Sequence, residues 1–83
     1  MDNWSVYIVE CSDGSLYTGI SNNVAERVKA HNAKKGAMSI KGKLPVKLVY
    51  QELLGTKSLA LKREYVIKKQ ARRDKLILIS TKL

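Results

Sequence analysis

Short runs rich in apolar residues open the chain and predict two neighbouring strands. Residues 4–11 and 15–20 are rich in Val, Ile, Tyr and Trp. Two such runs with a Gly-containing turn between them predict an antiparallel hairpin. A third run, residues 46–53, alternates well enough to predict a third strand. We expect Trp4 and the Val, Leu and Ile residues of these strands to form the core.

The register of this hairpin decides whether its two tyrosines share a face. A two-residue turn would point Tyr7 and Tyr17 to opposite sides of the sheet, because side chains alternate along a strand. A three-residue loop, 12–14, with Gly14 in the left-handed conformation instead pairs Tyr7 with Gly19. We favour the second register, which gathers Tyr7, Tyr17 and Gly19 on one face. The alternative is that both tyrosines simply fill the core with their hydroxyls at its rim.

Capping signals predict a helix directly after the hairpin. Asn23 is a suitable N-cap, and Glu26 follows three residues later in a capping-box-like pair. This helix is expected to end near Asn32. Residues 34–45 then form a basic, Gly-punctuated stretch that predicts a mobile loop.

The second half of the chain predicts one strand and two helices. Thr56 or Ser58 can cap a longer helix that runs to about Gln70, and a last helical piece follows residues 72–74. The element order is therefore β-β-α-β-α-α. The expected fold is α+β, with a small three-stranded antiparallel sheet flanked by helices, in a single domain covering residues 1–83.

The charge of the chain points to a polyanionic partner. Sixteen Lys and Arg residues against seven Asp and Glu residues give a net charge of +9. Residues 1–33 hold two of the bases and four of the acids, so the positive charge lies in residues 34–83. Nucleic acid is the first expectation, because neutralising phosphates releases counterions, although acidic lipid or a merely basic surface has the same composition.

Other features of the composition limit the setting of the protein. The single Cys11 permits no internal disulfide, and no His/Cys cluster offers a zinc site. No apolar stretch approaches the roughly 20 residues that span a bilayer. We expect a cytoplasmic monomer with no membrane association.

Two polar residues lie beside the apolar stripe of the first predicted helix. Val24 and Val28 define that stripe, His31 falls next to them, and Arg27 lies one turn before His31 at the edge. Alternatively, His31 is only a packing residue and Arg27 extends to solvent, and neither has a functional role.

A carboxylate interrupts the inward face of the second predicted helix. Glu64 shares an arc of about 60° with three apolar residues, Ala60, Ile67 and Ala71. A buried carboxylate is costly unless a cation matches its charge. Glu64 is therefore expected to bind a metal ion, or else to pair with Lys68 or Arg27.

Together these residues resemble the GIY-YIG nuclease superfamily. The segments SVY (5–7) and YTG (17–19) stand where that superfamily has its two name-giving triplets. The segments ERVKAHN (26–32) and KREYVIKK (62–69) carry the helix arginine and the helix glutamate. The resemblance covers residues 4 to about 80 and is greatest to the small stand-alone bacterial UPF0213 group.

The resemblance implies a role for each of the hairpin and first-helix residues. Tyr7 would be the general base for an attacking water, and Tyr17 would position or share that proton. Arg27 would bind the phosphate. His31 would orient or deprotonate Tyr7, or contact the phosphate, and Gly19 would admit a close backbone.

The resemblance also implies a cofactor and a reaction. Glu64 would hold one divalent cation, Mg²⁺ or Mn²⁺, since a site with a single carboxylate suits a hard ion that keeps several waters. The implied activity is metal-dependent endonucleolytic hydrolysis of DNA. Such an endonuclease could act on particular DNA structures or in DNA repair.

Several positions depart from the pattern of that superfamily. Ser5 stands in place of the first Gly, Thr18 in place of Ile, and Ile20 where one branch has Lys, and no Asn follows Asn32. These departures leave a second reading open, in which the chain is a non-catalytic nucleic-acid-binding module on the same scaffold.

Substrate contacts are expected from four lysines of the basic stretch: Lys34, Lys35, Lys41 and Lys43. A basic loop can follow a phosphate backbone without reading sequence, although any of these residues can instead be a solvated surface charge. We expect DNA rather than RNA as the partner. Base-specific readout is not expected, because the sequence shows no recognition helix or aromatic platform.

Overall fold

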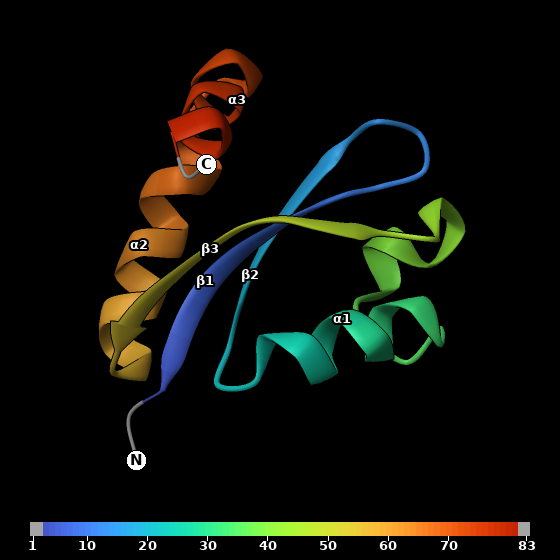
Figure 1. Ribbon diagram of the computed structural model, residues 1–83, viewed down its shortest axis with the longest axis horizontal. Helices are drawn as coiled ribbons and strands as arrows, with labels where there is room; N and C mark the ends of the chain where they lie inside the picture. The colour runs from blue at the N-terminus through green and yellow to red at the C-terminus, as the bar shows by residue number, and fades with distance from the viewer. Residues whose placement is uncertain (1–2, 82–83) are drawn as a thin grey trace.

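The computed structural model describes residues 3–81, which form a three-stranded antiparallel sheet with helices on both faces (Figure 1). The strand order is β2-β1-β3. The elements are β1 (Trp4–Glu10), β2 (Leu16–Ser21), α1 (Val24–Asn32), the 3₁₀ helix η1 (Met38–Lys43), β3 (Lys47–Gly55), α2 (Lys57–Lys69) and α3 (Arg72–Thr81). The expected α+β class and the order of strands and α-helices are confirmed. Within the described part of the chain, no helix has the length and apolar character to cross a membrane.

The hairpin adopts the register with the three-residue loop. Tyr7 pairs with Gly19 across β1 and β2, and Val9 pairs with Tyr17. The Cys11 N–H donates to the Ser15 carbonyl at 2.8 Å. Gly14 has φ +85°, a conformation that costs glycine little. The two tyrosines therefore share a face, as the sequence predicts.

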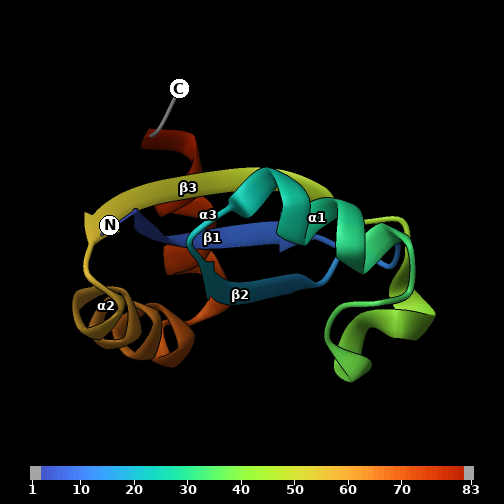
Figure 2. The ribbon, with the colours of Figure 1, turned by 90° about the horizontal axis from the view of Figure 1, so that it is seen from below.

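β1 is the centre of the core because it is buried on both faces. Its residues Val6 to Val9 have no exposed surface. On one face, Tyr7 and Val9 pack with residues of α1 and η1, and on the other, Val6 and Ile8 pack with Tyr50 and Ile67. Figure 2 shows the three strands side by side, with α1 in front of the sheet and α3 behind it.

Three residues expected in the core lie at its edge or outside it. Trp4 is only half-buried, since it lies at the beginning of β1. Leu53 is 67% exposed, and Leu48 is also exposed. Both belong to β3, which is an edge strand and is less covered by helices than β1.

Helices α1 and α2 begin at the predicted caps. The Asn23 side chain accepts a hydrogen bond from the Glu26 N–H at 3.3 Å. Thr56, rather than Ser58, caps α2, because its Oγ1 accepts from the Leu59 N–H at 3.1 Å. These bonds satisfy N–H groups that have no partner within their own helix.

The stretch expected to be a mobile loop is partly ordered, and that prediction is wrong for residues 38–43. They form η1, in which Ile40 is 3% exposed and packs into the core on the α1 face. The Ser12 N–H also donates to the Lys43 carbonyl at 2.8 Å, which ties η1 to the hairpin loop. Burial of one apolar residue and a backbone bond therefore fix this segment.

Candidate functional site

The Tyr7 hydroxyl is the centre of the cluster that the sequence predicts. Tyr7 is fully buried on β1, and its hydroxyl lies over Gly19 on β2. A Cβ atom built on Gly19 would lie 2.7 Å from Tyr7 Oη and 3.2 Å from Tyr17 Cε2. What approaches Gly19 within the protein is thus the Tyr7 side chain, and a close backbone of a bound partner at Gly19 stays a prediction. Glycine is needed here because any larger residue would displace the phenol.

His31 contacts this hydroxyl from α1. His31 Nε2 lies 2.8 Å from Tyr7 Oη, and the histidine is 1% exposed. Its other ring nitrogen, Nδ1, accepts a hydrogen bond from the Ala37 N–H at 3.3 Å. A backbone N–H can only donate, so Nδ1 carries no proton in this arrangement. In the neutral ring the proton is therefore on Nε2, and His31 donates to Tyr7.

This geometry favours one of the three roles predicted for His31, and all three stay predictions. A nitrogen that already carries a proton cannot remove the proton of Tyr7. Within residues 3–81 the structure shows no opening through which His31 would meet a phosphate directly, since the side chain is 1% exposed. The remaining expectation, that His31 orients Tyr7, agrees with the hydrogen bond between them.

Gly36 contributes to the cluster, and the sequence reasoning missed it. A Cβ atom on Gly36 would overlap His31 Nδ1, so the imidazole lies directly against the backbone of the turn after α1. The available signal is a glycine five residues after a histidine on an apolar helix stripe. Only the fold brings the following N–H, that of Ala37, to the ring.

Burial and charge act in opposite directions on the pKa of Tyr7. Burial raises it, a hydrogen bond from Arg27 lowers it, and the nearby Tyr17 raises it again, so that the pKa lies above its ordinary value of 10.0. Tyr7 is therefore a neutral phenol at pH 7 in the protein alone. Burial, followed by the charge of Arg27, lowers the pKa of His31 below 6.5, which keeps the imidazole neutral as well.

Tyr17 completes the aromatic part of the cluster. Its ring meets His31 edge-on, with 5.6 Å between the ring centroids, and the Tyr7 ring lies 6.1 Å from that of His31. Tyr17 is half-buried, so it extends from the buried Tyr7 toward solvent. The edge-on contact is a favourable aromatic arrangement and helps to hold His31 in place.

Arg27 connects the buried cluster to an open hollow. It is exposed on α1, and it lines a hollow of about 340 Å³ together with Trp4, Ile20, Ser21, Asn22 and Lys57. The Lys57 ammonium lies 5.2 Å from the centre of the Trp4 ring. Two cations thus border this hollow, which suits an anionic group such as a phosphate.

Glu64 lies near enough to act electrostatically on Tyr7, whose pKa it raises. Its side chain is 18% exposed and forms an ion pair with Lys68, Oε2 to Nζ 3.3 Å. The expected inward arc holds for Ala60 and Ile67, which are fully buried. It fails for Ala71, which is exposed and lies beyond the end of α2 at Lys69.

The donor set around Glu64 is compatible with a hard divalent cation. Among residues 3–81 no group of three or more His, Cys, Asp or Glu side chains could hold a metal ion. One carboxylate is enough for Mg²⁺ when waters and substrate oxygens complete its coordination. Lys68 is 53% exposed, so it can leave Glu64 for solvent at small cost.

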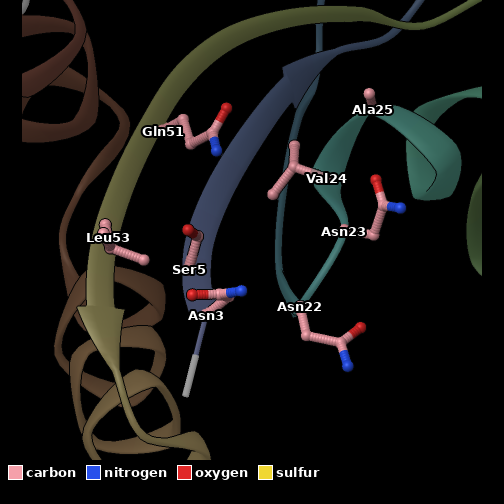
Figure 3. Close-up of a pocket in the computed structure, with 8 residues that line it drawn as sticks. All are labelled: Asn3, Ser5, Asn22, Asn23, Val24, Ala25, Gln51 and Leu53. Atoms are coloured by element: carbon pink, nitrogen blue, oxygen red, sulfur yellow. The ribbon is translucent and has the colours of Figure 1, made fainter. Parts of the chain in front are cut away.

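A second hollow lies between the sheet and the beginning of α1 (Figure 3). It has a volume of about 430 Å³. Besides the first two residues of α1, its lining consists of Asn3, Ser5, Asn22, Asn23, Gln51 and Leu53. Asn3, Asn22 and Gln51 were not singled out from the sequence, because isolated amides on strands and loops carry no periodic signal.

The four expected DNA-contacting lysines lie beyond the C-terminal end of α1. Lys34 and Lys35 follow that helix, and Lys41 and Lys43 belong to η1. The first three are exposed, whereas Lys43 pairs with Asp13 at 3.8 Å. The structure thus gathers them at one end of the molecule but leaves Lys43 partly neutralised.

Comparisons with known proteins identify the family of this chain. Residues 3–76 match the family described as the GIY-YIG catalytic domain. The UPF0213 proteins of Staphylococcus aureus strains Mu3 and N315 are each 58% identical over 79 residues, which is 95% of this chain and 96% of theirs.

A solved structure supports the same assignment. The solution NMR structure of the UPF0213 protein BH0048 from Bacillus halodurans has a TM-score of 0.63 and 42% identity. The match covers 96% of this chain and 85% of that one. The chain therefore belongs to the GIY-YIG family of nuclease domains.

Proposed function

We propose that this protein is a divalent-metal-dependent endonuclease that hydrolyses DNA phosphodiester bonds. The observation that carries the proposal is the surroundings of Tyr7 Oη, which lies 2.8 Å from His31 Nε2, beside Arg27, which lowers the pKa of the phenol. An N–H donor and a nearby guanidinium charge both favour the deprotonated form of a phenol.

In the proposed reaction Tyr7 is the general base. After it has lost its own proton to solvent, its oxygen, held by His31 and Arg27, accepts a proton from the attacking water. The water oxygen then forms a bond to phosphorus, and the bond to the leaving oxygen breaks with its electron pair. Tyr17 positions the water, and the exposed Arg27 guanidinium donates to a phosphate oxygen.

Glu64 would hold one Mg²⁺ or Mn²⁺ ion in this proposal. When bound, the ion supplies positive charge that stabilises the negative charge developing on the phosphate and the leaving oxygen. Lys68 leaves the carboxylate as the ion binds. Since Glu64 raises the pKa of Tyr7, neutralising the carboxylate also favours the phenolate.

We propose that the partner of this protein is DNA. We also propose that the protein is a cytoplasmic monomer. The support is the net charge of +9 and the gathering of Lys34, Lys35 and Lys41 on exposed positions. Their contacts would be to phosphates, so they would add affinity without sequence preference.

The second candidate is a non-catalytic nucleic-acid-binding module. The observation in its favour is the raised pKa of Tyr7, because a phenol that stays protonated cannot act as a base. In that case the scaffold and the basic end would bind nucleic acid without turnover.

One experiment separates the two candidates. Purified protein is incubated with labelled single-stranded, duplex, nicked and branched DNA, and with RNA, in Mg²⁺ or Mn²⁺. We expect cleavage that chelator abolishes and that Arg27→Ala and Glu64→Gln reduce about a hundredfold or more. Lys29→Ala, which removes another exposed cation of α1, is the control and should retain activity. Binding without cleavage of any substrate would establish the second candidate instead.

A further inference from the structure

The hollow between the sheet and the start of α1 differs in character from the rest of the molecular surface. The chain carries sixteen Lys and Arg residues among 83, yet the residues that line this hollow are all uncharged. Four of them carry side-chain amides: Asn3 before β1, Asn22 and Asn23 before α1, and Gln51 on β3 (Figure 3). Its volume of about 430 Å³ lies within the range of small-molecule sites, roughly 300–1,000 Å³.

This hollow adjoins the proposed catalytic cluster. Gln51 is the direct partner of Tyr7 across β1 and β3. Their Cα atoms are therefore about 5 Å apart, and both side chains are on the same face of the sheet. Asn22 lines this hollow and also the one that contains Arg27. If a phosphate contacts Arg27, the base of the same nucleotide therefore lies next to the amide-lined hollow.

The chemistry of the lining selects a nucleobase rather than a phosphate. Phosphate sites in proteins use cations or clustered N–H donors, and this lining has no cation. An Asn or Gln amide offers one acceptor and two donors, which complement the edge of a base. Leu53, with 67% of its surface exposed, adds an apolar wall against which a base can lie.

We propose that this hollow binds one unpaired nucleobase of the strand that the protein cleaves. The proposal rests on the nucleic-acid role proposed above. A base that is paired within a duplex cannot present its pairing edge to Gln51 and Asn22. The substrates are accordingly single strands, or duplexes in which the base next to the cleaved bond is unpaired or turned outward.

The test measures binding in chelator, so that it does not depend on turnover. The probe is a labelled single-stranded oligonucleotide about six nucleotides long, compared with the same sugar-phosphate backbone lacking all bases and with the matched duplex. We expect the wild type to bind the base-containing strand about tenfold more tightly than the other two. Gln51→Ala should reduce this preference to about twofold or less.

Two further measurements keep the result specific to the hollow. Ser39→Ala, which changes an exposed polar residue of η1, should leave the preference unchanged. In NMR spectra the side-chain amide signals of Asn22 and Gln51 should shift with the base-containing strand and not with the abasic backbone.

Equal affinity for the base-containing and abasic strands would overturn the proposal. An unchanged preference in Gln51→Ala together with unmoved amide signals would also overturn it. Failure of the nuclease proposal gives a different result. It is seen as the absence of cleavage in Mg²⁺, and the binding preference can still be measured in that case. A base-dependent preference without any cleavage would support the hollow and reject the nuclease.

Discussion

At the scale of single residues, the candidate site is arranged around one oxygen atom, Tyr7 Oη. It is buried over Gly19, 2.8 Å from His31 Nε2, and its pKa is raised by burial and lowered by Arg27. The N–H of Ala37 decides the direction of the bond between Tyr7 and His31 by occupying Nδ1. A backbone group outside the first helix thus sets the protonation of a side chain within it.

The tautomer of His31 is directly measurable. At pH 7.5 the imidazole ¹⁵N signals should identify a neutral ring with its proton on Nε2, because Nδ1 accepts from Ala37. Gly36→Ala should disturb this tautomer and lower the proposed nuclease activity, since its Cβ would overlap Nδ1. Gly42→Ala, with nothing within 4 Å of the added Cβ, is the matched control and should change neither. A proton found on Nδ1 in the wild type would contradict this account of the site.

Thr18 is a second residue whose role is decided locally. It is 4% exposed, and its hydroxyl oxygen is buried with no hydrogen-bond partner among residues 3–81. An unsatisfied buried polar group destabilises the folded state, so Thr18→Val should raise the free energy of unfolding by about 1 kcal/mol. Urea denaturation of both proteins measures this difference. A destabilised variant would show that the hydroxyl has a partner in solution.

At the scale of elements, η1 is held by packing rather than by its sequence. Its residues Met38–Lys43 include two lysines and a glycine, which by themselves indicate a loop. Ile40 nevertheless reaches the core cluster of Tyr7 and Val9, and the Ser12 N–H holds the end of η1. The basic end of the molecule is therefore attached to the same core that supports the site.

Ile40 is expected to be the anchor of η1. Ile40→Ala should lower the free energy of unfolding by about 2–5 kcal/mol, because it removes buried methyl groups from a packed core. Met38 belongs to the same element and is 78% exposed. Met38→Ala should therefore change stability by no more than about 0.5 kcal/mol. Equal effects of the two substitutions in urea denaturation would mean that η1 is not fixed through Ile40.

At the scale of the whole molecule, folding and the site depend on the same buried histidine. The folded chain keeps His31 neutral, with its pKa lowered by burial, whereas in the unfolded chain the pKa returns to about 6.5. Below that pH the unfolded state therefore binds a proton that the folded state does not. The stability associated with neutral His31 is fully present above pH 6.5 and is lost as the pH falls toward the lowered folded pKa.

Stability should accordingly fall as the pH decreases from about 6.5 to 5, by at most about 1.4 kcal/mol per pH unit. The carboxylates contribute little in this window, since their ordinary pKa values lie near about 4. Urea denaturation at several pH values measures the slope. The variant His31→Gln, although less stable overall, should show a flatter dependence over the same window. The same slope in both proteins would mean that another group takes up the proton.

Much of this protein could be predicted from its sequence, because the relevant forces act over short stretches of chain. Alternation along β1, Asn23 and Thr56 at their helix starts, and the three-residue loop with Gly14 all depend on neighbours in sequence. The grouping of Tyr7, Tyr17 and Gly19 follows from that register alone. The ordering of η1 and the exposure of Leu53 could not be predicted, because both depend on which distant residues cover them.

By itself, then, the sequence determined the strands, the helix starts, the shared face of the two tyrosines and the positive charge. Each of these depends on periodicity, capping or composition, which a chain carries in its local order. Only the tertiary structure decided that the Ala37 N–H directs His31 toward Tyr7, and that Gln51 and Asn22 border one uncharged hollow. Those relations join segments that are brought together by burial of the core, and hydrogen-bond direction and cavity shape depend on such contacts in space.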